Sequence, residues 1–86
     1  MPKAHVIVYS RPGCHLCEEA KESIRQAGCD ERFELEEINI ETSEHLLTRY
    51  RFDIPVITVD GEEAFRHRVD AATFRELILK CPPAFD

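Results

Sequence analysis

The chain has 86 residues, 43% hydrophobic and 33% charged, a balance typical of one globular domain rather than a disordered segment. We therefore assign residues 1–86 to a single domain. The formal net charge of −6 argues against a nucleic-acid or membrane-surface role, because both need excess positive charge to meet phosphate.

The first segment, 5–9, is a short apolar run rich in β-branched residues. It predicts a strand buried on both faces, as central parallel strands are. The run is too short for the apolar part of a signal peptide or for a membrane span. We therefore expect a cytoplasmic protein, in which structural disulfides are rare and closely spaced cysteines indicate catalysis or metal binding.

A helix follows the turn signal at 10–13. Its apolar positions recur at helical spacing and are Leu16, Ala20, Ile24 and Ala27. Gly28 is placed to end this helix. The helix begins at or near Cys14, so a cysteine stands at its amino terminus.

The segment 33–40 predicts a second strand. Its apolar alternation changes phase around Glu36 and Glu37, which indicates a bulge or an early end of the strand. Thr42 or Ser43 can then cap a short second helix, because either hydroxyl can accept a hydrogen bond from the first turn. The inward-facing residues of that helix are Leu46, Leu47 and Tyr50.

The last third of the chain predicts a hairpin and a final helix. Segments 56–59 and 62–67 are predicted antiparallel strands, because Asp60-Gly61 between them is a hairpin signal. Asp70 can cap the helix, which Pro82-Pro83 ends. Its apolar stripe is Ala71, Phe74, Leu77, Ile78 and Cys81. The order βαβαββα predicts an α/β fold with a four-stranded mixed sheet flanked by three helices.

Cys14 and Cys17 carry the main chemical signal. They lie where a buried strand turns into a helix, and this context makes the C-x-x-C spacing specific for a redox pair. Unpaired N–H groups and the helix dipole favour a thiolate at Cys14, the form that attacks a disulfide. Cys17 lies one turn further on and can resolve the mixed disulfide. A protonated His15 and nearby Arg11 would add positive charge at the thiolate.

Other interpretations of the cysteines are weaker. A zinc site needs further ligands, but Cys29, Cys81 and the other histidines provide no second closely spaced pair. Cys29 follows the helix-ending glycine and Cys81 continues an apolar stripe, so both are expected to be packing residues. Arg11 and His15 could equally be solvated side chains. We expect no metal and no tightly bound cofactor.

Pro55 directly precedes the predicted strand 56–59. Proline is tolerated at the start of a strand, because its missing N–H group need not join the hydrogen-bond ladder. Only about 5 to 6% of X-Pro bonds in folded proteins are cis, so the residue type alone predicts a trans bond.

The segment Tyr9-Ser10-Arg11-Pro12-Gly13-Cys14-His15-Leu16-Cys17, followed by Ala20-Lys21, matches a strand, turn and dithiol helix start, and Ile54-Pro55-Val56 matches a cis-proline segment. In these motifs, and from His5 to about Lys80, the chain resembles the glutaredoxins. The resemblance implies a thioredoxin-like fold and thiol-disulfide oxidoreductase activity, with Cys14 as nucleophile and Cys17 as resolving thiol. It also implies that the Ile54–Pro55 bond is cis and that the main chain of Ile54 pairs with a bound glutathione or peptide.

Three positions depart from the family pattern. Asp53 stands where the family has a threonine, His15-Leu16 replaces Pro-Tyr, and the glycine pair before the last helix is replaced around Arg66-His67-Arg68. Glycines allow the backbone to approach the tripeptide closely, and Asp53 adds negative charge near its carboxylates. Both changes oppose glutathione binding.

Other residues favour glutathione binding. Asp70 keeps the family's acidic position at the start of the last helix, and the arginines at hand for anionic glutathione are Arg11, Arg66 and Arg68. We expect glutathione to be a weak co-substrate. The expected electron donor is then thioredoxin reductase or a thioredoxin.

Functions of three classes follow from these residues. The leading hypothesis is a monomeric enzyme that exchanges dithiols with a disulfide-containing protein or a glutathione mixed disulfide. In an iron-sulfur cluster-binding module, Cys14 from two chains and two glutathiones would hold the cluster, and the purified protein would be brown. In a non-catalytic adaptor, the groove beside Pro55 would bind an extended partner without turnover.

Overall fold

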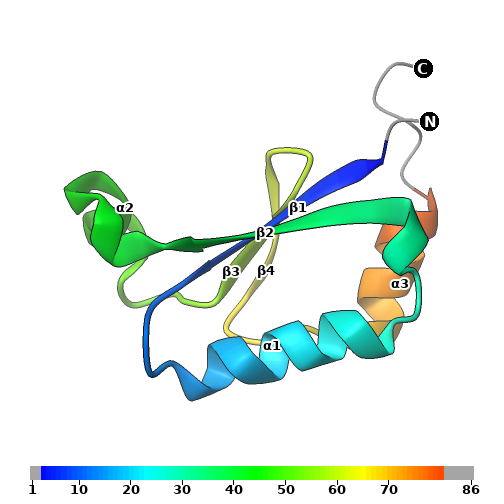
Figure 1. Cartoon of the computed structure of the whole chain (residues 1–86), viewed down its shortest axis with the longest axis horizontal. Helices are drawn as coiled ribbons and strands as arrows, with labels where there is room; N and C mark the ends of the chain where they lie inside the picture. Colours follow the sequence, from blue (N-terminus) through cyan, green and yellow to red (C-terminus); the bar gives the residue numbers. More distant parts are fainter. Residues whose placement is uncertain (1–2, 81–86) are drawn as a thin grey trace.

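The computed structural model describes residues 3–80, in which α-helices and strands alternate in the predicted order (Figure 1). The elements are β1 (Ala4–Ser10), α1 (His15–Gln26), β2 (Phe33–Asn39), α2 (Glu44–Tyr50), β3 (Val56–Val59), β4 (Glu62–Arg66) and α3 (Ala71–Lys80), with short 3-10 turns η1 (Asp30–Arg32) and η2 (Ile40–Thr42). No helix within 3–80 is both long and apolar enough to cross a membrane. The predicted positions of Cys81 and Pro82-Pro83 at the end of the last helix lie outside the described residues.

The four strands form one mixed sheet in the order β2-β1-β3-β4 (Figure 1). β1 and β2 are parallel, as a helical connection requires, whereas β3 is antiparallel to both β1 and β4. The register pairs Tyr9 with Val56, so β1 ends where β3 begins. The loop that carries Cys14 and the residue Pro55 therefore lie at the same end of the sheet.

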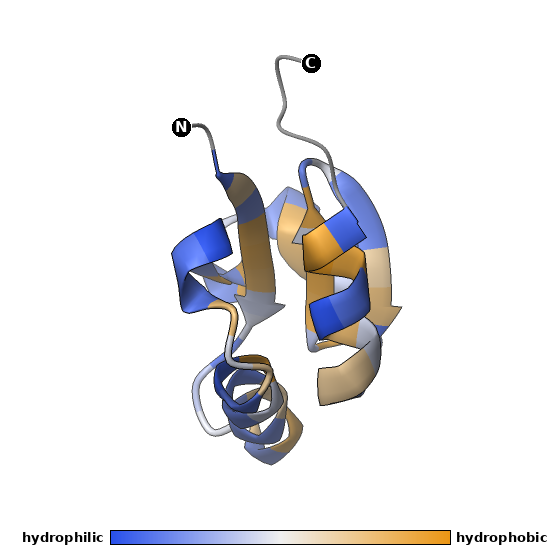
Figure 2. Ribbon diagram, turned by 90° about the vertical axis from the view of Figure 1, so that its right-hand side faces the viewer, coloured by the Kyte–Doolittle hydropathy of each residue, from blue (hydrophilic) through white to orange (hydrophobic). Residues whose placement is uncertain are grey.

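Helices cover both faces of the sheet. On one face, Val8 and Ile57 belong to a buried cluster that includes Phe74 of α3 and the inner residues of α1. On the other face, Tyr50 of α2 stacks on Tyr9 with ring centroids 4.7 Å apart. Figure 2 shows hydrophobic residues concentrated on the strands and hydrophilic residues on outer helix surfaces. Burial of each large apolar side chain stabilises this arrangement by about 1.5–3 kcal/mol.

β2 is regular, so the bulge considered around Glu37 is absent. The strand ends at Asn39, one residue before its predicted end. Glu37 is paired in register with Val8 and lies on the α1 face of the sheet, where Lys21 meets its carboxylate. The change in apolar phase therefore reflects a charged pair, partly exposed, between β2 and α1. The irregularity in this sheet lies instead between Ile57 and Thr58 of β3.

Local signals place the turns and helix ends. Ser43 caps α2 through its hydroxyl, and Asp70 caps α3 by accepting hydrogen bonds from Thr73, at 2.7 Å from its hydroxyl and 2.9 Å from its N–H group. These two hydrogen bonds lower the pKa of Asp70. Between β3 and β4, Asp60 and Gly61 both have positive φ, 51° and 88°, which suits a two-residue hairpin turn.

Candidate active site

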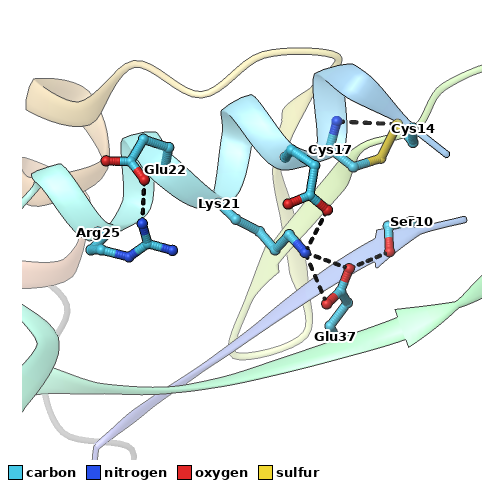
Figure 3. Close-up of polar contacts among 8 residues, drawn as sticks. Ser10, Cys14, Cys17, Lys21, Glu22, Arg25 and Glu37 are labelled. Carbon is cyan, nitrogen blue, oxygen red and sulfur yellow. Dashed lines mark hydrogen bonds and ion pairs between the residues drawn. A yellow bond between two sulfur atoms is a disulfide. The ribbon is translucent and has the colours of Figure 1, made fainter. Parts of the chain in front are cut away.

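Cys14 and Cys17 form a disulfide at the amino terminus of α1 (Figure 3). Their Cα atoms are 5.2 Å apart. Cys14 is the N-cap residue, with extended backbone, and its sulfur accepts a hydrogen bond of 3.1 Å from the N–H group of Cys17. In the reduced protein, the same N–H group and the positive end of the helix dipole favour a thiolate at Cys14.

The two sulfurs differ in accessibility. Cys17 is 1% exposed and lies in the core, whereas Cys14 is half-buried. The turn that presents Cys14 is closed by its N–H group, which donates to the carbonyl of Arg11 at 3.3 Å. Gly13 adopts a φ of +78° in this turn, a conformation that glycine reaches without strain. Cys14 is therefore the more accessible of the two cysteines.

A polar network joins α1 to β1 and β2 beside the disulfide (Figure 3). Lys21 Nζ lies 2.9 Å from Glu18 Oε2 and 3.1 Å from Glu37 Oε2, and Ser10 Oγ donates to Glu37 at 2.8 Å. Burial raises the pKa of Glu37, but the hydrogen bonds from Ser10 and Lys21 outweigh burial, so the pKa is lowered. The hydrogen bond to Glu18 raises the pKa of Lys21. The network is therefore charged at neutral pH and ties α1 to the sheet.

Arg11 and His15, the predicted positive residues, pair with carboxylates. Arg11 Nε and Nη2 donate to Glu41 Oε2 at 3.1 and 2.7 Å. The His15 ring is 86% exposed, and its Nε2 lies 2.9 Å from Glu19. Neither side chain forms a hydrogen bond or ion pair with Cys14 in the part of the chain that the structure describes. The group that contacts the sulfur is the N–H of Cys17.

The Ile54–Pro55 peptide bond is cis, in agreement with the prediction from the glutaredoxin resemblance. The carbonyl of Pro55 accepts a hydrogen bond of 2.8 Å from the N–H group of His67. This bond ties the loop before β3 to the turn before α3. Among residues 3–80, neither the N–H nor the carbonyl group of Ile54 has a hydrogen-bond partner. Both groups are unpaired and can meet the backbone of another chain.

The charged residues near Pro55 differ in whether they form ion pairs. Arg66 bonds to Glu63 and lies 3.5 Å from Asp53, so one guanidinium is shared between two carboxylates. Arg68 is exposed and has no ion pair within the described ranges. His67 has a φ of +70°, in the left-handed region that favours glycine. The residue that replaces a family glycine thus keeps a backbone conformation that suits glycine.

Two features beside the cysteines were not identified from the sequence. One is the Lys21–Glu37 contact, whose partners are sixteen positions apart and give no local signal. The other is Phe52, which is 80% exposed. Its place in Arg51-Phe52-Asp53, a polar segment without helical or strand periodicity, could have marked it as a surface aromatic.

The remaining cysteine in the described chain, Cys29, lies at the opposite end of α1. It is 5% exposed, and burial raises the pKa of its thiol, which makes it a poor nucleophile. Asp70, predicted as a substrate contact, acts as the cap of α3. Throughout 3–80 no three His, Cys, Asp or Glu side chains converge to hold a metal ion.

Comparison with known proteins identifies the family. A family model described as glutaredoxin-like domain (DUF836) matches residues 5–79. A "Glutaredoxin-like protein YDR286C homolog" of Dictyostelium discoideum is 38% identical over an alignment of 68 residues, and the match covers 72% of this chain. The chain spans 63% of the length of that relative.

Solved structures share the fold. The protein XcR50 of X. campestris superposes with a TM-score of 0.75 at 25% identity, covering 90% of this chain and 99% of its own. Chloroplastic thioredoxin z superposes with a TM-score of 0.71 at 16% identity, covering 91% of this chain and 77% of its own, and this likeness concerns the fold alone. The thioredoxin fold and the paired cysteines support a redox type of function. Because the family model matches residues 5–79, the chain belongs to the glutaredoxin-like domain family.

Proposed function

We propose that the protein is a thiol-disulfide oxidoreductase that reduces disulfides by dithiol exchange through Cys14 and Cys17. The observation that carries the proposal is the asymmetry of the pair. One sulfur is accessible at a helix amino terminus, and its partner, one turn away, is 1% exposed. Such a pair suits one attacking and one resolving thiol.

The proposed reaction has two exchanges. The Cys14 thiolate attacks a substrate disulfide, so that a Cys14–substrate bond forms, the substrate S–S bond breaks, and the leaving thiolate takes a proton from water. Cys17 then loses its proton and attacks Cys14 Sγ, which forms the Cys14–Cys17 disulfide and releases the second substrate thiol. Two electrons pass to the substrate, and an external dithiol, or two thiol molecules, returns them to the pair and is oxidised to a disulfide.

The proposed substrate is a protein disulfide or a mixed disulfide with glutathione. The unpaired main chain of Ile54 supports binding of an extended segment beside Cys14. Glutathione is proposed as a weak co-substrate, because Arg66 is engaged by Glu63 and Asp53 and leaves Arg68 as the unpaired cation of this turn. The proposed donor is a thioredoxin reductase or a thioredoxin, and the proposed enzyme is a cytoplasmic monomer without a bound cofactor.

A trapping experiment tests the proposal. Variants Cys17→Ser and Cys14→Ser, both with Cys29→Ser as a common background, are reduced and mixed with 2-hydroxyethyl disulfide. We expect Cys17→Ser to gain a stable mercaptoethanol adduct at Cys14, because the attacking thiol survives and the resolving thiol is gone. Cys14→Ser should gain none at Cys17. Intact mass and peptide mapping read out the result.

The same preparations separate the alternatives. Equal trapping by both variants would indicate a structural or metal-binding pair. Brown protein whose iron and colour are lost in Cys14→Ser would favour the cluster-binding module. Wild-type protein that fails to reduce any disulfide, while it still binds peptides, would favour the adaptor.

A further inference from the structure

Phe52 is the most exposed large hydrophobic residue in the described chain, at 80%. It stands three residues before the cis proline, in the loop between α2 and β3. The loop is held by hydrogen bonds on both sides of Phe52, from Arg51 N–H to the Leu47 carbonyl at 3.0 Å and from Asp53 N–H to the Tyr50 carbonyl at 2.8 Å. A bonded turn thus presents the phenyl ring to solvent at the end of the sheet where Cys14 also lies.

One arginine contacts this ring, and two others belong to neighbouring segments. The guanidinium carbon of Arg51 lies 4.8 Å from the centroid of the Phe52 ring, a cation–π contact. Arg66 reaches Asp53, the residue after Phe52, and Arg68 lies in the turn that bonds to Pro55. We call the set Arg51, Phe52, Arg66 and Arg68 the Phe52 surface. It combines an apolar anchor with cations, two of which, Arg51 and Arg68, have no ion pair within residues 3–80.

Charge is distributed unevenly about the disulfide. Residues 49–55 and 66–68 together carry four arginines and one acid, and one of these arginines, Arg66, is bonded to Glu63 of β4. Residues 11–41, which include α1 and β2, carry nine acids and four Lys or Arg. The protein therefore attracts negative charge on one side of Cys14 and repels it on the other, an arrangement that orients a charged partner.

We propose that the Phe52 surface docks an acidic protein whose disulfide is reduced at Cys14. Phe52 packs against an apolar side chain of that protein, and Arg51 and Arg68 meet its carboxylates. The acidic side of the molecule excludes the reverse orientation, so the bound segment runs along the unpaired main chain of Ile54. The inference rests on the proposed function and specifies its substrate class.

Other anionic ligands fit the Phe52 surface less well. Glutathione has carboxylates for the arginines but no apolar group to cover Phe52. Nucleic acids and anionic membranes need many phosphate contacts, whereas this surface offers two unpaired arginines in a chain of net charge −6. An acidic protein with an apolar contact residue matches both components of the surface.

Two peptide disulfides serve as probes. One is rich in Glu and Leu around its cysteines, and the other has Lys in place of each Glu. We expect pre-reduced wild-type protein to reduce the acidic peptide at least about tenfold faster at low salt, because association is steered by charge. The preference should shrink at roughly 0.5 M salt, at which exposed charges are screened.

Variants test whether the preference for the acidic peptide depends on the Phe52 surface. Phe52→Ala and Arg51→Ala should each slow reduction of the acidic peptide roughly five- to tenfold, the range of an interface anchor. Both should reduce 2-hydroxyethyl disulfide, which is too small to span the surface, at the wild-type rate. Arg51→Glu should reverse the preference toward the basic peptide. Matched controls are Leu35→Ala and Arg32→Ala, exposed residues near the other end of the sheet.

Several results would overturn the docking proposal. One is equal rates with both peptides, and another is loss of rate in the control variants as large as in Phe52→Ala. A third is dependence of glutathione mixed-disulfide reduction on Arg68 without any dependence of peptide reduction on Phe52, which would indicate a site for a small anion. Pelleting of the protein with anionic vesicles, without peptide selectivity, would indicate a membrane contact instead.

Failure of docking and failure of the proposed function are distinguishable. Peptides with Ser in place of Cys bind without reacting, and binding to a Cys14→Ser/Cys17→Ser variant is followed by chemical shifts at Phe52. Binding without turnover of any disulfide would refute the enzyme and keep the docking surface. Turnover of 2-hydroxyethyl disulfide without selective peptide binding would refute the docking surface and keep the enzyme.

Discussion

The two flanks of the disulfide differ in how completely their polar groups are paired. On the α1 flank, Lys21, Glu37 and Ser10 bond to one another, and Arg11 bonds to Glu41. The other flank is formed by the loop before β3 and the turn before α3. There the main chain of Ile54 and the side chains of Arg51 and Arg68 have no hydrogen bond or ion pair within residues 3–80, and Phe52 is exposed. The first flank ties α1 to the sheet, and the second leaves polar groups unpaired.

This difference explains why similar residues have different expected roles. Lys21 and Arg51 are both cations near the cysteine pair, yet Lys21 has two carboxylate partners and Arg51 has an aromatic ring. Removing Lys21 leaves Glu37 without its cation, whereas removing Arg51 leaves no charge unpaired. Measurements on the two flanks should therefore separate effects on stability from effects on recognition.

The largest expected difference is in thiol reactivity, since Cys14 is half-buried and Cys17 is 1% exposed. Iodoacetamide at neutral pH should label Cys14 of the reduced protein at least about a hundredfold faster than Cys17, because the thiolate at the helix terminus is the reactive form. Peptide mass spectrometry over time gives the rates. Faster labelling of Cys17 or Cys29 would refute Cys14 as the nucleophile.

A smaller effect is expected on the paired flank. Glu37→Gln should lower the free energy of unfolding at neutral pH by less than about 1 kcal/mol, because the side chain is 43% exposed and its ion pair is screened by solvent. The folded-state pKa of Glu37 lies below its ordinary value of 4.5, so its charged form stabilises the fold above that value. The stabilisation is lost as the pH falls through the folded-state pKa.

Urea unfolding at several pH values tests whether the stabilisation by Glu37 is lost as the pH falls. The difference between wild type and Glu37→Gln should be present near pH 7 and should shrink on acidification below about pH 4. Glu34→Gln, an exposed position on the same strand, is the matched control. A difference of the same size at neutral and acidic pH would mean that the charge of Glu37 does not stabilise the fold.

The smallest effect is expected on the open flank. Phe52→Ala and Arg51→Ala should change the free energy of unfolding by no more than about 0.5 kcal/mol, because both side chains project into solvent. Thermal and urea unfolding test this expectation. A larger loss would show that the loop before β3 needs these side chains, and would weaken the distinction between the flanks.

Local sequence signals predicted much of the fold. Asp60-Gly61 and Asp70 act through their immediate neighbours, so a turn and a helix start could be placed from the residues themselves. Glu37 led to a wrong expectation of a bulge. Its position on the α1 face of β2 is favoured by Lys21, which belongs to a different element. A phase change in a strand can thus report a charged pair with a neighbouring helix.

The site was predictable to a similar extent. Cys14 and Cys17 were identified by spacing and context, and the cis bond at Pro55 by family resemblance. The pairing of Arg66 with Asp53 could not be predicted, because it depends on how the end of β4 lies against the loop before β3. Asp53 in isolation suggested repulsion of glutathione, whereas in the folded chain it lies near Arg66, which also pairs with Glu63.

The order of the sheet gives the acidic composition a further consequence. Among residues 3–80, β2 and β4 are the outer strands, and each has one side whose backbone groups lack a neighbouring strand. β2 carries Glu34, Glu36 and Glu37, and β4 carries Glu62 and Glu63. Another copy of the chain that added its own outer strand would bring like charges together across the new ladder. The glutamates thus protect the open sides of the sheet against aggregation, a protection that protonation of their carboxylates would remove.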